Sequence, residues 1–188
     1  MSNRDTTPDS DSWPNHALRV QVRPFGPSEE TLREVARSVV EQATVRERLG
    51  HARSRLLSLD LLDGDTKGQR VAAAPRNYRA TIYDYTHNRT LLVSGCLNSY
   101  EQVEVTESAT QPLPSREEFE EAVELLARDE RIGAELREQR LAPYNPMPPI
   151  LAVEHPDGSS ERVIVVGLHA PNQQGGHRIV GVNLVLQR

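Results

Sequence analysis

The chain has 188 residues and a mass of 21.0 kDa, a length typical of one medium domain or two small ones. Hydrophobic residues make up 37% and charged residues 26%, a globular composition, and no apolar run approaches the roughly 20 residues that cross a bilayer. The formal net charge of −5 argues against nucleic-acid binding. The single cysteine excludes an internal disulfide and agrees with a reducing cytoplasm, where we expect the protein to be located.

Residues 1–16 are polar and Pro-containing, and we expect them to form a disordered tail. The rest of the chain contains an internal repeat. The segment Pro27-Ser28-Glu29-Glu30-Thr31-Leu32 recurs as Pro114-Ser115-Arg116-Glu117-Glu118-Phe119, and the apolar positions that follow keep this register. At a slightly larger offset, residues 56–60 match residues 150–154, and Asp63-Gly64 matches Asp157-Gly158. A match through helix, strand and turn predicts two copies of one unit, at residues 17–110 and 111–188.

Each unit begins with a helical pattern. In the first unit, one apolar stripe has helical spacing: Leu32, Val35, Ala36, Val39, Val40 and Ala43. Ser28 is the predicted N-cap of this helix, and Ser115 with Glu118 forms an S-x-x-E capping box at the start of the second one. Shorter helical stretches are predicted around residues 45–54 and 130–139.

Strands follow the helices in both units. Leu57, Leu59 and Leu61 alternate with polar residues, which predicts a half-buried strand with the three leucines on one face. Further strands are predicted at 78–85, 89–97, 102–106, 150–154, 162–168 and 178–187. A helix followed by antiparallel strands buries its apolar stripe best when the sheet wraps around it. We therefore predict an α+β fold of two tandem cystatin-like units, each a helix packed on an antiparallel sheet, with a boundary near residues 107–114.

The second unit departs from the first at a Pro-rich insert, residues 142–149. Prolines lower the entropy lost when a loop is fixed against a partner, and tyrosine and methionine are favoured at interfaces. These properties select a candidate partner interface: Pro143, Tyr144, Pro146, Met147 and Pro148. We expect the side chains of Tyr144 and Met147 to be exposed. A stiff connector between helix and strand, without any partner, explains the same residues equally well.

Two segments resemble the openings of the two small N-terminal domains of copper amine oxidases. They are Val22-Arg23-Pro24-Phe25-Gly26-Pro27-Ser28-Glu29-Glu30 and Gln111-Pro112-Leu113-Pro114-Ser115-Arg116-Glu117-Glu118-Phe119-Glu120-Glu121-Ala122. The resemblance implies tandem cystatin-like domains with the helix-then-strands order. In that family these domains flank a large catalytic domain that carries copper and topaquinone.

The catalytic motifs of that family are absent from this sequence. The family forms topaquinone within N-Y-[DE] and binds copper with three histidines, two of them as H-x-H. Here Asn77-Tyr78-Arg79 has arginine at the acidic position, and no two histidines are two residues apart. We therefore expect Tyr78 to be an ordinary strand tyrosine, and we expect no catalytic, cofactor-binding or metal-binding residue in this chain.

The resemblance implies a role in amine metabolism as a non-catalytic subunit of a split copper/topaquinone amine (tyramine) oxidase. Its partner would be the catalytic oxidase subunit, which would hold the copper and the topaquinone, with no nucleic acid or membrane involved. Homodimer and hetero-oligomer both stay open. The alternative is a free-standing cystatin-like module that binds a small ligand or another protein and has no enzymatic activity.

Four other patterns favour structural explanations. Residues 102–106 lack the glycine of the Q-x-V-x-G protease-inhibitor motif and are typical of an alternating strand. The basic cluster is expected to be a solvated surface near a helix C-terminus rather than a phosphate or acidic-partner site: Arg46, Arg48, His51, Arg53 and Arg55. The acidic run is expected to complement the helix dipole: Glu117, Glu118, Glu120, Glu121 and Glu124. The histidines in the strand ends and the loop of the second unit are expected to be exposed residues rather than metal ligands: His155, His169 and His177. Cys96 is expected to be a buried inert thiol rather than a nucleophile.

Overall fold

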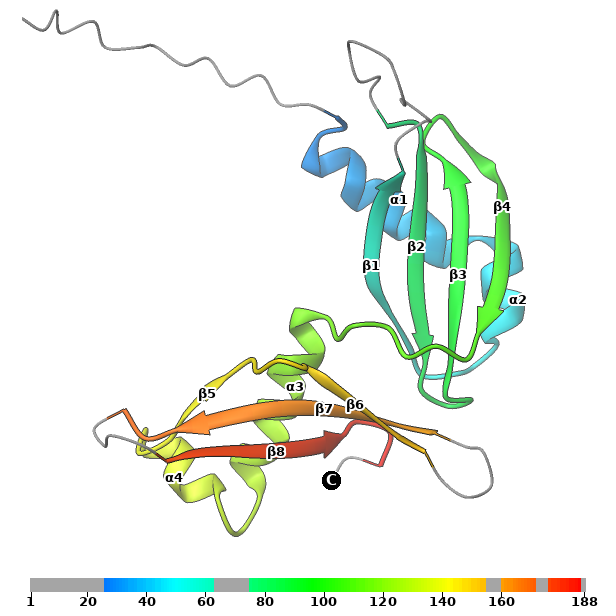
Figure 1. Ribbon diagram of the computed structural model, residues 1–188. Coiled ribbons are helices and arrows are strands. Elements are labelled where there is room, and N and C mark those ends of the chain that lie inside the picture. The colour runs from blue at the N-terminus through cyan, green and yellow to red at the C-terminus, as the bar shows by residue number, and fades with distance from the viewer. Residues whose placement is uncertain (1–25, 63–74, 155–159, 172–175, 187–188) are drawn as a thin grey trace, which may run out of the picture.

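The computed structural model describes residues 26–62, 75–154, 160–171 and 176–186, and Figure 1 shows its two helix-on-sheet units. The first unit contains α1 (Glu29–Glu41), α2 (Ala43–Leu49), β1 (Ser54–Leu62), β2 (Asn77–Asp84), β3 (Arg89–Cys96) and β4 (Ser99–Ser108). The second contains α3 (Arg116–Arg128), α4 (Gly133–Arg137), β5 (Ala142–Tyr144), β6 (Ile150–Glu154), β7 (Ser160–His169) and β8 (His177–Asn183). The predicted α+β class is confirmed, whereas the tail at 1–16 and the two Asp-Gly pairs lie outside the described residues.

Both long helices begin at the predicted caps. The Ser28 hydroxyl accepts a hydrogen bond from the backbone N–H of Thr31 at 3.1 Å. At the start of α3, the Ser115 hydroxyl accepts from the Glu118 N–H, and the Glu118 carboxylate accepts from the Ser115 N–H, which completes the capping box. These side chains satisfy backbone donors that have no partner within the first helical turn, so each helix starts at a defined residue.

The first sheet is antiparallel throughout, in the order β1-β2-β3-β4, and α1 and α2 pack on it. Tyr78 on β2 is fully buried in this core, opposite Gly95 on β3. A Cβ atom at Gly95 would clash with the Tyr78 ring, so the glycine makes room for the tyrosine. The prediction that Tyr78 is a strand tyrosine on a sheet face is confirmed.

A β-bulge changes the faces of β1. The register with β2 shifts between Leu56 and Ser58, and an extra residue in one strand turns the side chains around it to the other face. Leu59 and Leu61 pack on the first core, as Leu56 does, whereas Leu57 packs on the core of the second unit. The prediction that Leu57 shares a face with Leu59 and Leu61 is therefore wrong.

The second sheet is built around β7. β5 pairs with Gly167–His169 and β6 with Ser160–Ile164, while β8 pairs with Val163–His169. Because β8 overlaps both of the other pairings, β5 and β6 must lie together along the opposite edge of β7. The insert therefore interrupts an edge strand. β5 was not among the strands predicted from the sequence.

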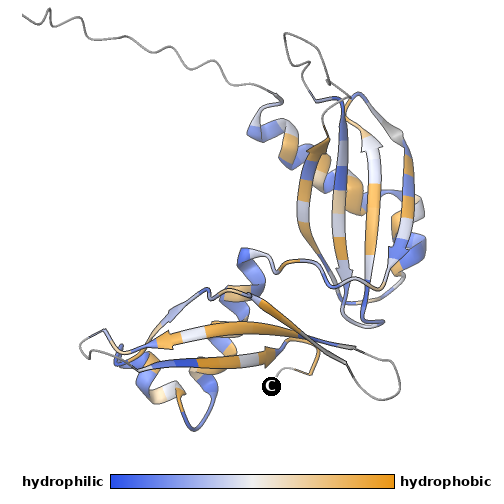
Figure 2. Cartoon of the chain, in the orientation of Figure 1, coloured by the Kyte–Doolittle hydropathy of each residue, from blue (hydrophilic) through white to orange (hydrophobic). Residues whose placement is uncertain are grey.

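The core of the second unit lies between α3 and one face of β7 and β8. Its main strand residues are Ile164, Val166, Leu168 and Val182, and Figure 2 shows hydrophobic residues concentrated along β7. Tyr83 and Tyr85 of the first unit also belong to this core. Over the described ranges, none of the helices combines the length and the apolar character that spanning a bilayer requires.

Candidate functional site

The predicted partner interface lies where the edge strand is interrupted, between β5 and β6. Met147 is 88% exposed, and Pro143 and Pro148 are exposed as well. Pro146 is buried, and Tyr144 is half-buried. The exposed side chain of Met147 therefore directly follows Pro146, a proline that is buried against the rest of the protein.

Tyr144 is not the exposed side chain that the sequence analysis expected. Its backbone pairs with Gly167 on β7, and its ring covers that glycine so closely that a Cβ atom there would clash with it. An aromatic ring over a strand glycine packs against the bare backbone. Tyr144 therefore has a structural role in the sheet.

Two histidines lie beside Tyr144 on the same face of the sheet. His169 and His177 are cross-strand partners at the ends of β7 and β8. His177 is exposed, as expected, whereas His169 is half-buried. The Tyr144 hydroxyl and the His177 Nδ1 atom are hydrogen-bonded at 3.2 Å. The three ring centroids lie 5.6 to 6.1 Å apart. His155 lies outside the described residues.

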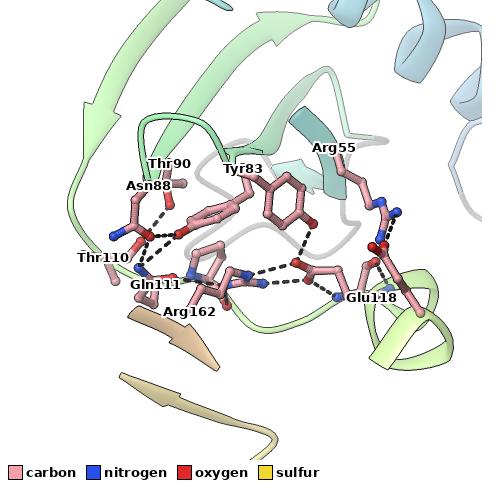
Figure 3. A network of polar contacts seen from close by, with 12 residues as sticks. Arg55, Tyr83, Asn88, Thr90, Thr110, Gln111, Glu118 and Arg162 are labelled. Carbon is pink, nitrogen blue, oxygen red and sulfur yellow. Dashed lines mark hydrogen bonds and ion pairs between the residues drawn. The ribbon is translucent and has the colours of Figure 1, made fainter. Parts of the chain in front are cut away.

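A second polar cluster lies between the two units, shown in Figure 3. Glu118 and Arg162 are both fully buried, and the Arg162 Nε and Nη2 atoms donate to the Glu118 carboxylate at 2.8 and 2.7 Å. The Tyr85 hydroxyl donates to the same carboxylate at 2.6 Å. The Arg162 guanidinium also lies over the Tyr83 ring, 4.5 Å from its centroid. We refer to these four side chains as the buried network.

The connector between the units completes the hydrogen bonding of Arg162. Its Nη1 atom donates to the Pro112 carbonyl oxygen at 2.8 Å and to the Gln111 side-chain oxygen at 3.3 Å. The Gln111 amide nitrogen in turn donates to the Tyr83 hydroxyl at 3.2 Å. A buried guanidinium is tolerated when its charge is paired and its donors are used.

The predicted solvation of the basic cluster holds for Arg53, which stays exposed, but not for Arg55, which is half-buried. Glu121 on α3 accepts from Arg53 and Arg55 at 2.7 Å each. Arg53 also donates to the Leu184 carbonyl oxygen and lies over the Tyr85 ring. Glu118 of the acidic run lies in the first turn of α3, where negative charge was predicted to be favourable, and it is fully buried. Arg55 pairs with Glu121 and Glu118 accepts from Tyr85, so each of these two charges has a partner from the other unit.

The environment of the network shifts the titration of its tyrosines. Burial raises the pKa of Tyr85 strongly, and the adjacent Glu118 carboxylate raises it further because a phenolate there would face a second negative charge. Burial also raises the pKa of Tyr83. Both phenols therefore stay protonated at neutral pH, and the Tyr85 hydroxyl acts as a donor to Glu118.

The hairpin that carries Tyr85 is held by Asp84. This fully buried carboxylate accepts from the N–H groups of Thr86 and His87 at 3.1 Å, from the His87 ring at 2.7 Å and from Arg89 Nε at 3.1 Å. Burial alone would raise the pKa of Asp84, but the hydrogen bonds from His87 and Arg89 outweigh it, and the pKa lies below its usual value. Asp84 thus fixes the turn beside the buried network.

Two surface hollows do not bring together an arrangement of catalytic groups. One, of about 430 Å³, is lined by Arg55, Leu125, Arg128 and four glutamates of α3: Glu117, Glu120, Glu121 and Glu124. Three of these glutamates already pair with arginines, so the hollow does not assemble an acid and a base. The other, of about 520 Å³, lies beside Tyr78, Gly95 and Cys96. The Cys96 thiol is half-buried rather than buried.

Within the described ranges, no group of three or more His, Cys, Asp or Glu side chains is placed to hold a metal ion. The buried network was not predicted from the sequence, although Glu118 was recognised as a helix cap. One signal was available for Arg162. It shares strand parity with Ile164, Val166 and Leu168, so it had to point into the core, where an arginine needs a buried carboxylate.

The fold and these contacts define the class, a tandem helix-on-sheet α+β protein whose second unit holds a buried ion pair that two tyrosines of the first unit contact. Comparison with known proteins finds no family model that matches this chain and no curated protein that matches it.

Proposed function

We propose that this chain is a non-catalytic subunit that docks on a separate chain carrying copper and topaquinone, and that the two form a split amine oxidase with tyramine among its substrates. The resemblance of residues 22–30 and 111–122 to the small domains of copper amine oxidases carries the proposal. The helix-then-strands order of both units supports it, because each resembling segment leads into the first helix of one unit.

The exposed insert supports a docking role. Met147 offers an adaptable apolar side chain at 88% exposure, beside a proline that is buried. A side chain on a held segment loses little entropy when a partner covers it. Methionine is also enriched in interface cores. These properties make Met147 the residue that we expect to insert into the catalytic chain.

The buried network supports the same role. The ion pair between Glu118 and Arg162 joins α3 to β7, and Tyr83 and Tyr85 bring the first unit against it. A docking surface that spans both units is then fixed before binding. Preorganisation of this kind reduces the free-energy cost of association.

The test is co-expression with a copper/topaquinone amine oxidase catalytic chain, followed by co-purification and measurement of the dissociation constant. We expect a stable complex, and we expect Met147→Ala to weaken it by about tenfold, as for a moderate interface contact. Leu113→Ala is the matched control, since Leu113 is also an exposed apolar side chain, 71% exposed, but lies in the connector. Failure of the chains to co-purify would contradict the proposal.

The second candidate is a free-standing binding module, which the hollow of about 520 Å³ beside Tyr78 and Cys96 favours. Its volume is in the range of small-molecule sites. Native mass spectrometry of the purified chain would distinguish the two. A bound small molecule that is lost on Gln102→Trp, a substitution of a residue that lines the hollow, would favour the module over the oxidase subunit.

A further inference from the structure

β8 forms an open edge of the second sheet (Figure 1). In the first unit, β4 covers β3 along Thr90–Cys96. β8 follows β7 as β3 follows β2, yet in the described part of the chain no strand pairs with its other side. A free strand edge presents N–H and C=O groups that can pair with another strand.

The other sheet edges carry features that hinder pairing. β1 has the bulge between Leu56 and Ser58, and the edge formed by β5 and β6 is interrupted by the Pro-rich segment 145–149. β4 carries Glu104 and Glu107. β8 has neither a proline nor a carboxylate, and its register with β7 is unbroken from His177 to Asn183. Bulges, prolines and charged side chains usually protect a strand edge against pairing. Of these features, β8 has only the basic side chains of His177 and Arg178, at its first two positions.

The side chains of β8 also leave an apolar residue uncovered. Ile179 is 58% exposed and lies opposite Gly167. Gly181 lies opposite Val165, on the same face. Val180 and Val182 alternate with them and pack on the other face, toward α3. On its outer face, β8 therefore has a large exposed side chain at Ile179 and, two residues further on, no side chain at Gly181.

We propose that β8 pairs antiparallel with β8 of a second copy of this chain, about a two-fold axis at Val180. In this register Ile179 of each copy faces Gly181 of the other. Arg178 faces Val182, so no like charges meet. The chain already pairs large side chains with strand glycines in this way, as Tyr144 covers Gly167. The strand is thus complementary to itself, which a two-fold interface requires.

The self-complementarity of β8 favours a second copy over a strand from a different protein. A seven-residue strand pair is a small interface, so we expect a dissociation constant on the order of 10–100 μM. This dimer does not depend on the proposed docking to a catalytic chain, because Met147 lies on the other edge of the sheet.

Analytical ultracentrifugation of the full chain between about 1 and 500 μM tests the proposal, since mass action then shifts the population. We expect a concentration-dependent dimer. Ile179→Lys should keep the chain monomeric over this range, because an edge lysine opposes pairing. The matched control is Leu151→Lys on β6, a 45% exposed apolar residue at the other edge, which should dimerise like the parent. A chain that is monomeric throughout, or an Ile179→Lys variant that dimerises normally, would overturn the proposal.

Disulfide trapping tests the register. In a Cys96→Ser background, Val180→Cys places two thiols opposite each other at the axis and should give a covalent dimer on mild oxidation. Ile179→Cys is the control, because its two copies would lie diagonally, farther apart than the about 7 Å between Cα atoms that a disulfide spans. Cross-linking of Ile179→Cys without that of Val180→Cys would show that the strands do not pair in this register.

Discussion

The Glu118 carboxylate on α3 accepts a hydrogen bond of 2.6 Å from Tyr85, which belongs to the other unit. The same carboxylate accepts from the Ser115 N–H at the start of its own helix, and it holds the Arg162 guanidinium of β7. One buried side chain therefore caps a helix, joins that helix to its sheet and contacts the first unit. Its removal should disturb all three.

We expect Glu118→Gln and Arg162→Met, each alone, to lower the free energy of unfolding by about 3–5 kcal/mol, because either change leaves an uncompensated buried charge. Chemical denaturation followed by circular dichroism measures this. The double variant Glu118→Gln/Arg162→Met should lose less than the sum of the two. As a control, Glu120→Gln breaks only the exposed pair with Arg116 and should change stability little. Additive single effects would argue against a coupled pair.

Acid should destabilise the protein partly through Asp84. Its pKa is lowered in the folded state, so the unfolded chain binds its proton at a higher pH than the folded chain does. The stability that Asp84 contributes is present above its unfolded pKa, about 4, and is lost as pH falls from there through the folded value. We expect Asp84→Asn to lower stability at neutral pH and to flatten the decline between about pH 4 and pH 2. An unchanged slope in denaturation midpoints against pH would contradict this assignment.

Tyr85 should resist alkaline titration. Because burial and Glu118 raise its pKa, its phenol should ionise only when the protein unfolds. Burial also raises the pKa of Tyr83, so difference absorbance should show at least two fewer early-titrating phenols than the sequence contains. Tyr85→Phe should leave the early phase unchanged. The same variant should lower the free energy of unfolding by about 1–3 kcal/mol, because it removes a donor from a buried carboxylate. Loss of early amplitude in Tyr85→Phe would show that this phenol is accessible.

Gly167 and Tyr144 should behave as a size-matched pair. Gly167→Ala places a Cβ atom against the Tyr144 ring, and overpacking of this kind costs about 1–3 kcal/mol. In a Tyr144→Ala background, the same glycine substitution should cost much less, since the ring is gone. Thermal unfolding of the four proteins in this cycle measures the coupling. Equal costs in both backgrounds would show that the two side chains do not contact each other.

Local signals predicted most of the fold. The Ser28 cap and the Ser115–Glu118 capping box located both long helices, because the bonds that start a helix form within four residues. Residues 150–154 were predicted as the strand that the structure contains. The Pro-rich insert was located as well, but β5 within it was not, since pairing with β7 overrides the local preference of prolines for loops.

The missed features depend on contacts between distant residues. The bulge turns Leu57 toward the second core while its neighbours on β1 pack on the first core. The alternation of residues within β1 does not indicate that a second core lies beside this strand. Glu118 was recognised as a helix cap but not as a buried ion, because its partner Arg162 lies far along the chain. Strand parity could have predicted that Arg162 is buried. It could not have predicted the carboxylate that it meets.

The placement of Tyr83 and Tyr85 in the second core has a consequence for thermal unfolding. A fragment ending before residue 111 would expose two aromatic rings to water, and a fragment beginning there would lack side chains that its own helix and sheet pack against. The two repeats should therefore melt in a single calorimetric transition whose van't Hoff and calorimetric enthalpies agree. The sequence contains two copies of the unit, yet we expect the two units to unfold together as one cooperative unit.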